Sequence, residues 1–508
     1  MSPIRKLVIA GGGTAGWMSA AALARFVPPT TELVLVESES IGTIGVGEAT
    51  IPPLADFNHM LGIDEHTFLK ETGGTYKLGI DFVDWGDVGS RYFHPFSQFG
   101  FDVNGLGFHQ VWQWLENDQT RWPLDTFAIG AQASARARFI RPRLDDPQSP
   151  LAQMRHAYHI DAGRYAAFLR LYAEQRGVTR IEGRIESVQR DPHDGTIESL
   201  LLDDGQRLSA DFFVDCTGFR ALLVGDSLGS QWIDWSHWLP CDRAIAVPSE
   251  AHTRMETCTR STAHRAGWQW RIPLQHRTGN GHVYCSEFMD DNEAETLLLA
   301  HIDTQVTDSP RPLRFRTGRR DQLWVKNCVA IGLSSGFVEP LESTSIHLIQ
   351  EGISKLLALF PNAEDNNVLR DEYNELMVRL YDDVRDFIVL HYVANQRSES
   401  PFWQAVANMA IPDSLASRID RFRQRGQWFA HRADLFAETS WVAVMIGQGI
   451  RPDTTHPLVE SLDPAALQHQ LTEMAAVYQA ASEKMPPHVA YINRFCRTED
   501  SAYQYAAA

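Results

Sequence analysis

A short apolar segment that runs directly into a glycine-rich turn limits the fold of this chain more than any other feature. Residues 6–10 read Lys-Leu-Val-Ile-Ala, the next six read Gly-Gly-Gly-Thr-Ala-Gly, and an alanine-rich segment with helical spacing, residues 17–26, follows. Gly11, Gly13 and Gly16 fit the pattern G-x-G-x-x-G in the strand–turn–helix context that gives this motif its meaning. The first two glycines let the backbone turn and approach a pyrophosphate, and the third lets helix and strand pack closely. The segment therefore predicts a Rossmann-like unit that binds a dinucleotide.

A second apolar segment, residues 32–36, ends at Glu37, which is 21 residues beyond Gly16. A carboxylate at this strand end accepts hydrogen bonds from both ribose hydroxyls of an adenosine and repels a 2′-phosphate. The first backbone N–H groups of the helix face the phosphates. We therefore predict cofactor contacts from Gly11, Gly13, Thr14, Ala15, Gly16 and Glu37.

The overall charge and the cysteine content argue against several classes of protein. The formal net charge is −18, which disfavours nucleic acid or an anionic membrane as the principal partner. The six cysteines are scattered, without Cys-x-x-Cys and without zinc-ligand spacing, so we predict free thiols in a reducing cytoplasm and no metal site. We expect no transmembrane helix, because no run of about 18 apolar residues occurs. We also expect no signal peptide, because three glycines interrupt the apolar segment after Arg5-Lys6.

Two tryptophans placed one residue apart form the second distinctive pattern. Residues 267–273 read Gly-Trp-Gln-Trp-Arg-Ile-Pro, and on a strand the indoles of Trp268 and Trp270 point to the same face. Aromatic residues at a spacing of two are most often packing residues of a core. The pair by itself therefore leaves a packing role and a functional role open.

Further segments decide between these two interpretations. Residues 76–79 read Tyr-Lys-Leu-Gly, residues 92–96 read Tyr-Phe-His-Pro-Phe, and residues 337–346 read Phe-Val-Glu-Pro-Leu-Glu-Ser-Thr-Ser-Ile. Residues 42–50 read Gly-Thr-Ile-Gly-Val-Gly-Glu-Ala-Thr. With these segments in this order, together with the glycine turn and Trp-x-Trp-x-Ile-Pro, the chain resembles the flavin-dependent halogenases of the tryptophan-halogenase family. The resemblance extends from residue 4 to at least residue 350.

The resemblance implies that the dinucleotide is FAD. Residues 211–218 and 327–332 each read as a buried strand that ends in small residues, similar to FAD contacts of glutathione-reductase-type flavoproteins. Further cofactor contacts are implied at Gly47, Glu48, Ala49, Gly332 and Leu341. The implied fold is α/β (α+β), an FAD-binding, glutathione-reductase-type Rossmann-like module with an intertwined substrate portion and a helical C-terminal layer.

The resemblance also implies a chemistry and a partner. A separate NADH-dependent flavin reductase supplies diffusible FADH2, and reduced FAD with dioxygen turns a halide into hypohalous acid. Lys77 matches the family's essential lysine, which holds the oxidant by a hydrogen bond or as a haloamine, and the sequence leaves both modes open. Glu342 matches the catalytic glutamate, which orients the oxidant or accepts the proton that the arene loses. Without the resemblance, Glu342 beside Pro340 is equally a candidate cap of a helix that begins near Ser343. Trp268 and Trp270 match residues that wall off the flavin.

The halide and the arene have their own candidate residues. The family binds halide through backbone N–H groups that correspond to Thr344 and Ser345, near a helix start that favours anions. Ser345 replaces a common glycine of the family, so both bromide and chloride are candidates. The chain has no Tyr-Tyr pair, a feature that helps tryptophan-specific members to hold the amino-acid end. We therefore expect a small aromatic substrate, indole or an indole derivative, at His94, Pro95, Phe96 and Trp441.

Secondary-structure patterns suggest two parts. Strand patterns and glycines concentrate before residue 335, whereas residues 346–360, 368–393 and 464–484 carry apolar residues at helical spacing. Asp463 and Pro464 have the residue types of an N-cap and a first helical position. We predict a sheet-rich FAD-binding module over residues 1–345, with interleaved substrate-site segments. A helical portion over residues 346–508 would close the substrate site.

Three alternatives remain. A single-component FAD aromatic hydroxylase of the same superfamily usually carries an Asp-Gly pair near the second flavin contact, and residues 214–220 have none. A non-catalytic FAD-binding regulatory protein would leave Lys77, Glu342 and the tryptophan pair unexplained. Residues 332–336 also match G-x-S-x-G, the nucleophile elbow of hydrolases, but they continue into Phe-Val-Glu-Pro instead of a helix.

Overall fold

The computed structural model describes residues 2–40, 47–116, 122–143, 145–147, 149–363, 366–429 and 434–502. Contacts divide the chain into two compact units of three segments each. Unit 1 comprises Met1–Thr72, Ile160–Pro240 and Phe315–Val384, and unit 2 comprises Gly73–His159, Cys241–Arg314 and Arg385–Ala508. Both units are discontinuous, as the expected intertwining of the substrate portion requires. The expected boundary at residue 345 lies inside the last segment of unit 1, so contacts do not divide the chain there.

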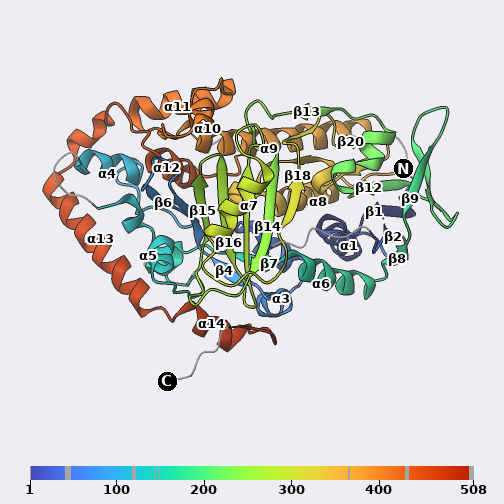
Figure 1. The fold of residues 1–508 in the computed structure, drawn as a ribbon, viewed down its shortest axis with the longest axis horizontal. Helices are drawn as coiled ribbons and strands as arrows, with labels where there is room; N and C mark the ends of the chain where they lie inside the picture. Colours follow the sequence, from blue (N-terminus) through green and yellow to red (C-terminus); the bar gives the residue numbers. More distant parts are fainter. Residues whose placement is uncertain are drawn as a thin grey trace. The chain divides into compact units, whose positions relative to one another are not determined.

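Unit 1 is built on a six-stranded sheet that is parallel except at one edge (Figure 1). In spatial order its strands are β20 (Trp324–Val325), β21 (Cys328–Ala330), β12 (Phe212–Asp215), β1 (Lys6–Ala10), β2 (Glu32–Glu37) and β8 (Thr179–Glu182). Only β20 runs antiparallel to its neighbour. Leu7, Val8 and Ile9 are fully buried, because helices and loops cover both faces of a parallel sheet. The predicted Rossmann-like sheet is confirmed.

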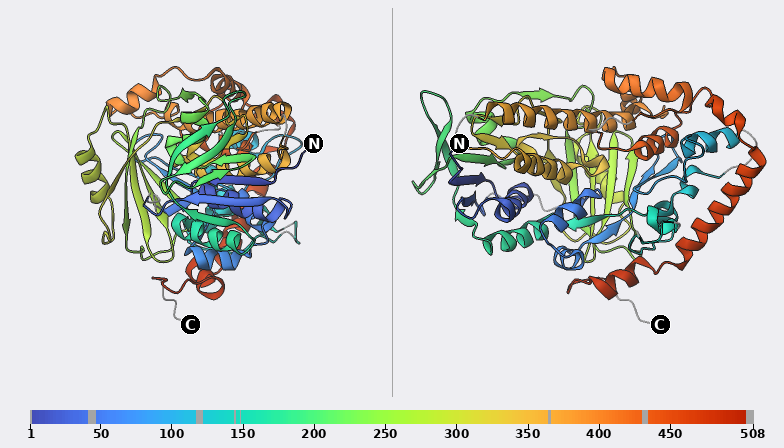
Figure 2. Two further views of the ribbon diagram at one scale, coloured as in Figure 1. Left: turned by 90° about the vertical axis from the view of Figure 1, so that its right-hand side faces the viewer. Right: turned by 180° about the vertical axis from the view of Figure 1, so that it is seen from behind.

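The helices of unit 1 pack on this sheet and on each other. Helix α1 (Thr14–Phe26) contacts α6 (Ala162–Glu174) and α8 (Ser345–Ala358), and the shorter helices are α2 (Pro53–Met60) and α3 (Glu65–Thr72). Strand β3 (Gly47–Ala49) precedes α2. Two small three-stranded sheets complete the unit. One consists of β11 (Arg207–Ser209), β10 (Ile197–Leu202) and β9 (Ile185–Arg190), and the other consists of β13 (Trp232–Asp234), β19 (Gly318–Arg320) and β22 (Gly336–Phe337). The β9–β10 hairpin extends beyond the six-stranded sheet (Figure 2, right view).

Unit 2 is built on a seven-stranded sheet. Its spatial order is β18 (Arg311–Arg314), β14 (Arg243–Ser249), β17 (Thr278–Tyr284), β16 (Gly267–Pro273), β15 (Thr259–His264), β5 (Gly79–Val83) and β6 (Arg91–Pro95). The pairs are antiparallel except β15 with β5. Every residue of β17 is buried, because α7 (Asp291–Ala300) covers one face of this part of the sheet (Figure 1).

The rest of unit 2 consists of one strand pair and helices. Strand β4 (Thr75–Lys77) pairs antiparallel with β7 (Ala157–Asp161), which ends at the boundary with unit 1. The long helix α9 (Asn367–Val393) begins in unit 1 and ends in unit 2. The remaining helices are α4 (Phe108–Glu116), α5 (Ile129–Ala135), α10 (Pro401–Ala407), α11 (Asp413–Arg425), α12 (Glu438–Gly447), α13 (Pro464–Lys484) and α14 (His488–Phe495).

The predicted helical C-terminal region is confirmed. Between residues 345 and 502 the described part of the chain contains helices and no strand. Helix α13 starts at Pro464 as expected, and the Asp463 carboxylate accepts hydrogen bonds from the backbone N–H groups of Ala465 and Ala466. Such an N-cap is typically worth about 1 kcal/mol.

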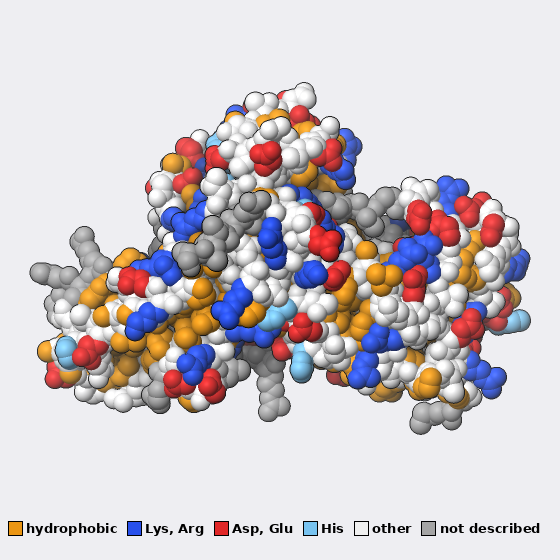
Figure 3. All heavy atoms as spheres, turned by 90° about the horizontal axis from the view of Figure 1, so that it is seen from below, with side chains coloured by type: hydrophobic (Ala, Val, Ile, Leu, Met, Phe, Trp, Pro, Cys, Tyr) orange, Lys and Arg blue, Asp and Glu red, His pale blue; other side chains and the backbone are white. Residues whose placement is uncertain are grey.

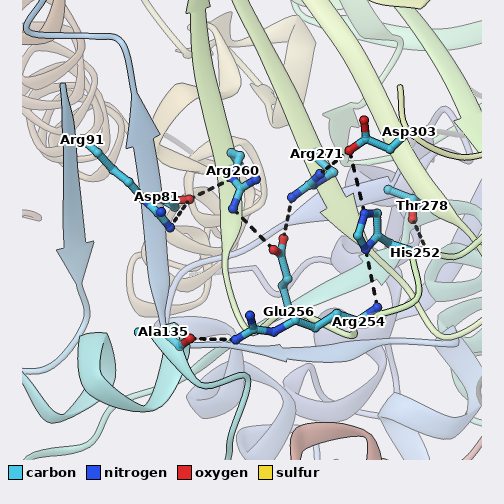
Figure 4. A network of polar contacts seen from close by, with 10 residues as sticks. All are labelled: Asp81, Arg91, Ala135, His252, Arg254, Glu256, Arg260, Arg271, Thr278 and Asp303. Atoms are coloured by element: carbon cyan, nitrogen blue, oxygen red, sulfur yellow. Dashed lines mark hydrogen bonds and ion pairs between the residues drawn. The ribbon is translucent and has the colours of Figure 1, made fainter. Parts of the chain in front are cut away.

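A chain of ion pairs crosses four neighbouring strands of the seven-stranded sheet (Figure 4). Asp81 on β5 is buried, and its two carboxylate oxygens lie 2.7 Å from Arg91 Nε on β6 and 2.9 Å from Arg260 Nε on β15. Arg260 and Arg271 on β16 share the carboxylate of Glu256. A slip of one residue would turn Asp81 to the other face of the sheet and leave its charge unpaired. The network therefore fixes the register of β5, the strand that follows β4 in the chain.

Two buried histidines under α7 make the stability of unit 2 depend on pH. Burial and the neighbouring His264 lower the pKa of His282 to about 3, and burial and His301 lower the pKa of His264 to about 4. The unfolded chain binds these protons near pH 6.5. Stability is therefore fully present above that pH and is lost as the pH falls toward the folded pKa values.

We expect His282→Asn to reduce this pH dependence. Each unit of pKa corresponds to about 1.4 kcal/mol and the unfolded ring is already half protonated at pH 6.5, so the wild-type protein should lose roughly 2 kcal/mol per ring between pH 6.5 and pH 4.5. Urea unfolding at both pH values measures the loss, and the variant should lose about half as much as the wild-type protein. An unchanged loss in the variant would exclude His282 as a source.

The surface and the remaining side chains bear on the possible partners. On the face shown in Figure 3, basic and acidic side chains are intermixed, which differs from the stripe of one sign that nucleic-acid binding uses. All six cysteines are free. Within the described ranges no group of three His, Cys, Asp or Glu residues is placed to hold a metal ion, and no helix is long and apolar enough to span a membrane.

Candidate functional site

The glycine turn of unit 1 has the geometry that the sequence predicts. Gly11 has a φ of +106°, and a Cβ there would lie 2.3 Å from the carbonyl oxygen of Cys216. A Cβ on Gly16 would lie 1.9 Å from the carbonyl oxygen of Gly11. At Gly13, in contrast, a Cβ would meet nothing within 4 Å. The fold itself requires glycine at positions 11 and 16, whereas Gly13 leaves open space at the start of α1.

The start of α1 can accept an anion. Gly13 is the N-cap, no side chain caps the helix, and no acidic residue lies in its first turn. The N–H groups of Thr14 and Ala15 belong to the first turn, whose amides have no partner inside the helix. These donors, the helix dipole and the open space at Gly13 fit a pyrophosphate.

Glu37, at the end of β2, lies against this turn. A Cβ on Gly12 would lie 1.5 Å from Glu37 Oε2, so the carboxylate occupies the space beside the glycines. Its other oxygen lies 2.6 Å from Arg180 Nε on β8. Arg180 has no sequence signal of its own, because only the pairing of β2 with β8 places it beside Glu37.

The turn after β21 packs against the start of α1. Gly332 has a φ of +81°, and a Cβ there would lie 2.7 Å from the Cβ of Ala15. Gly332 and Ala15, two predicted cofactor contacts that are far apart in sequence, are thus neighbours. Ser334, in the same turn, is fully buried, and its hydroxyl donates to the carbonyl oxygens of Asp215 and Ile331. The hydroxyl therefore holds the turn in place, which argues against the hydrolase alternative.

Two acids of unit 1 are desolvated. The Asp215 carboxylate is fully buried and accepts hydrogen bonds from backbone N–H groups of residues 217, 223 and 224. Burial raises its pKa and raises the pKa of Glu48, on β3 between Gly47 and Ala49, to about 7. Residues 42–46, the first part of the family-like segment 42–50, lie outside the described residues, whereas the predicted cofactor contacts Gly47, Glu48 and Ala49 lie within them.

Glu342 and the predicted halide residues form one tight turn in unit 1. Leu341 and Glu342 are buried in a 3-10 turn, Pro340–Glu342, and Ser343 follows with a φ of +61°. The next helix, α8, starts at Ser345, and its N-cap is Thr344 without a side-chain cap hydrogen bond. A capping role for Glu342 is therefore wrong.

The start of α8 has the donors of a small-anion site. The backbone N–H of Ser345 belongs to the first turn of a 14-residue helix, where amides are left for other acceptors. The Thr344 hydroxyl oxygen is buried and has no hydrogen-bond partner among the described residues. The arrangement can hold a halide-sized anion.

Lys77, in unit 2, is fully buried on β4. Its Nζ lies 5.2 Å from the centroid of the Phe96 ring, within the distance of a cation–π contact. The backbone explains this contact, because the N–H of Phe96 donates to the carbonyl of Leu78, the residue after Lys77. Leu78 in turn donates to Thr257, which ties the lysine segment to the seven-stranded sheet.

An aromatic cluster connects the predicted substrate residues. The His94 ring lies 5.8 Å from the Phe387 ring, and Phe387 lies 4.9 Å from Trp441 and 3.9 Å from Phe436. His94 and Trp441 are buried. Pro95 is opposite Gly79 in the β5–β6 pair and is also buried. Phe387 on α9 thus joins His94 and Trp441, and sequence reasoning missed it.

The far side of Trp441 is also filled. Trp428 stacks on it with ring centroids 4.8 Å apart, and the Arg418 guanidinium lies 4.7 Å from the Trp441 ring. Arg418 NH2 is 2.8 Å from the Asp434 carboxylate. The charge of this arginine is therefore already balanced by Asp434.

Trp268 and Trp270 are both buried, and their ring centroids lie 6.1 Å apart, as expected for two indoles on the same face of β16. Trp268 lies 6.3 Å from Trp85, which contacts Trp403, so this indole packs within an aromatic cluster. Trp270 lies over Gly281 of β17, where a Cβ would be 2.0 Å from the indole. The glycine leaves the space that the ring of Trp270 occupies.

Comparisons with known proteins show which chains this one is similar to. A family model described as tryptophan halogenase matches residues 6–464. A tryptophan 6-halogenase from Streptomyces toxytricini is 35% identical over 513 residues, which cover 96% of this chain and 97% of that protein. The structure of a flavin-dependent halogenase from Xanthomonas campestris has a TM-score of 0.94 at 46% identity, covering 98% of this chain and 99% of the other. A flavin-dependent halogenase from Brevundimonas sp. BAL3 has a TM-score of 0.93 at 43% identity, covering 97% and 99%.

Proposed function

Because this chain belongs to the tryptophan halogenase family, we propose that it halogenates indole or an indole derivative and prefers bromide. Members of the family are flavin-dependent enzymes that need a separate flavin reductase. The observation that carries the proposal is the buried Lys77 over Phe96, in the same unit as the aromatic cluster around Phe387. A cytoplasmic location stays a prediction.

Residues of unit 1 would hold the cofactor and the halide. The donors at Gly13, Thr14 and Ala15 fit the pyrophosphate of FAD, and Glu37 fits the adenosine ribose. Together with dioxygen, bound and reduced FAD would supply the oxidising equivalents that turn halide into hypohalous acid. The contacts that we propose on this side are Gly11, Gly13, Thr14, Ala15, Gly16, Glu37, Gly47, Glu48, Ala49, Gly332 and Leu341 for FAD, and Thr344 and Ser345 for halide.

Lys77 would confine the oxidant. A buried ammonium donates a directed hydrogen bond, and the same nitrogen, once deprotonated, would carry the halogen as a haloamine. In both cases the lysine delivers an electrophilic halogen to one arene instead of releasing it. Trp268 and Trp270 would exclude the arene from direct contact with the flavin, since both indoles are packed in place.

Glu342 would act late in the reaction. Its carboxylate is fully buried in the Pro340–Glu342 turn. A carboxylate can accept the proton that the arene loses when it regains aromaticity, and water can partly replace it in this role. Removal of Glu342 is therefore less harmful than removal of Lys77.

The choice of indole over tryptophan rests on charge. Free tryptophan carries an ammonium and a carboxylate, and burying both without partners costs several kcal/mol. The wall at His94, Phe387 and Trp441 is aromatic, and the nearby Arg418 is already paired with Asp434. Indole has neither charge, and a loosely held indole reacts at C3, its most nucleophilic carbon. Bromide is easier to oxidise than chloride and tolerates the serine at position 345.

A competition experiment tests this proposal. The protein is incubated with FAD, a flavin reductase, NADH, oxygen, equal bromide and chloride, and equal indole and tryptophan. We expect bromoindole substituted mainly at C3 to be the dominant product by mass spectrometry and NMR. Dominant chlorotryptophan substituted on the benzo ring would contradict the argument from charge.

The same experiment separates the alternatives. A hydroxylated indole without halogen would favour the single-component hydroxylase, and in that case NADH alone would reduce the bound flavin without a reductase. An unchanged indole, with FAD bound, would favour the regulatory protein. The wild-type Streptomyces toxytricini tryptophan 6-halogenase serves as a control that the assay detects halogenated tryptophan.

A further inference from the structure

Two buried histidines hold strand β4, which carries Lys77, in unit 2. His159 on β7 is opposite Thr75 in the strand pair, and its two ring nitrogens lie 3.0 Å from Thr75 Oγ1 and 3.0 Å from Thr259 Oγ1. His488 on α14 lies 3.2 Å from the backbone nitrogen of Tyr76. All three residues of β4 are buried. The strand is therefore tied to β15 on one side and to α14 on the other.

The direction of each hydrogen bond around His159 follows from its neighbours. The Thr75 hydroxyl donates to the carbonyl oxygen of Pro273 at 2.7 Å. Its oxygen must then accept from Nδ1–H of His159, which places a proton on Nδ1. In the neutral ring that burial favours, Nε2 of His159 carries no proton and accepts from the hydroxyl of Thr259. The series Thr259–His159–Thr75, which we name the His159 chain, therefore suits a neutral imidazole with its proton on Nδ1.

His488 is held in the same form by independent contacts. The backbone N–H of Tyr76 donates to Nε2 of His488, and Nδ1 lies 3.3 Å from the carbonyl oxygen of Met255, to which only an Nδ1–H can donate. Both histidines that flank β4 are thus neutral and have the same tautomer.

The electrostatic surroundings also favour neutral rings. Burial, the charge of Lys77 and His488 lower the pKa of His159 well below its usual value, and burial lowers the pKa of His488 to about 4. Other titratable rings near this strand are those of His156, Tyr158 and Tyr491, which lie 5.3, 6.0 and 5.6 Å from the Tyr76 ring. A second positive charge beside Lys77 would repel it in a site with little water.

The strand geometry connects the His159 chain to Lys77. Side chains alternate along a strand, so Thr75 and Lys77 point to the same face. Opposite Lys77 in the pair with β7 is Ala157, whose small side chain leaves the lysine room. A shift of Thr75 would therefore be transmitted to the lysine on the same three-residue strand.

We propose that His159 is a positioning residue for Lys77 and that it acts through its hydrogen bonds to Thr75 and Thr259. The His159 chain fixes β4 against β15 and keeps an uncharged ring on the face of the lysine, so that Nζ stays over the Phe96 ring. This inference rests on the proposed role of Lys77. His159 itself does not need to touch the arene or the oxidant.

The sharpest test is Thr259→Val, because it removes one hydroxyl and keeps the shape of the side chain. Nε2 of His159 then loses its donor, which weakens both the tie to β15 and the preference for a neutral ring. With indole, bromide, FAD and a flavin reductase, we expect halogenated product per FADH2 oxidised to fall by about tenfold at pH 7.5. The rate of FADH2 oxidation and the KM for indole should stay within about twofold of wild type.

The pH profile distinguishes positioning from a general loss of stability. In Thr259→Val the ratio of product to oxidised FADH2 should be lowered by the same factor from pH 8 to pH 6, because burial and the charge of Lys77 still keep the ring neutral. Partial unfolding would instead lower product formation and FADH2 oxidation together, and more strongly at pH 6. Thr259→Ser, which restores the hydroxyl, should restore the ratio. Thr262→Val, a matched change on the same strand but on the other face, should leave the ratio unchanged.

The outcomes separate this inference from the proposed function. If Lys77→Ala is inactive while Thr259→Val has the wild-type ratio and profile, the inference about His159 is wrong and the role of Lys77 stands. If Thr259→Val loses product formation and FADH2 oxidation by the same factor, the role of the His159 chain is merely structural and the inference is also wrong. If Lys77→Ala still halogenates indole, the role of Lys77 and the inference about His159 both fail, whereas the proposed halogenation of indole stands.

Discussion

Lys77→Ala is expected to lower halogenation by roughly a hundredfold or more while FADH2 oxidation and oxygen consumption continue. The loss corresponds to about 2.7 kcal/mol or more of transition-state stabilisation. It should be this large because the lysine acts after hypohalous acid forms, at a step that water cannot perform with the same orientation. Parallel measurement of halogenated product by mass spectrometry and of oxygen uptake by electrode checks the separation.

Two variants serve as controls for this result. Lys70→Ala removes an exposed lysine of α3 in unit 1, and its product yield should equal that of wild type. Glu342→Gln should retain more activity than Lys77→Ala, because water substitutes in part for a proton acceptor. If Lys77→Ala keeps more than about half of the wild-type yield, Lys77 has no part in the mechanism.

The second large effect is expected from a pair of glycine variants in the turn before α1. Gly16→Ala places a Cβ 1.9 Å from the carbonyl oxygen of Gly11, so the turn or the helix must move. We expect a loss of about 3 kcal/mol or more in the free energy of unfolding, and FAD affinity lowered by roughly a hundredfold. Urea unfolding and fluorescence titration with FAD measure the two quantities.

Gly13→Ala is the matched variant, because a Cβ there meets nothing within 4 Å. Its free energy of unfolding without FAD should stay within about 0.5 kcal/mol of wild type. Its affinity for FAD should fall by about tenfold, since the methyl group occupies the space through which a pyrophosphate approaches the backbone. If Gly13→Ala binds FAD like the wild-type protein, the pyrophosphate does not lie at this turn.

Local sequence patterns predicted the elements that depend on neighbouring residues. The strand over residues 6–10, the glycine turn and the start of α13 at Pro464 are found where expected. The predicted strand over residues 32–36 extends by one residue, to Glu37. The shared face of Trp268 and Trp270 is also found as expected, because alternation along one strand places both indoles on one side. These features are encoded over a few residues, so one sequence is enough to read them.

The sequence also identified Lys77 and Glu342 as candidate catalytic residues, but only through the resemblance of the chain to a family. An isolated buried lysine has no pattern of its own, and Glu342 had a competing interpretation as a helix cap. The structure removed that interpretation, because α8 begins at Ser345 with Thr344 as its N-cap. Burial of both side chains is a property of the folded chain, which composition does not reveal.

Only the tertiary structure decided which distant residues meet. Tyr76 and His488 are separated by 412 positions and share a hydrogen bond, and Phe387 joins His94 to Trp441 from a helix whose spacing shows only that one face is buried. The two discontinuous units have the same origin. Periodicity records which side of a strand or helix is apolar, but not which other element covers it. The partner is chosen by packing over the whole chain, and for that reason the His159 chain and the wall around Trp441 became visible only in three dimensions.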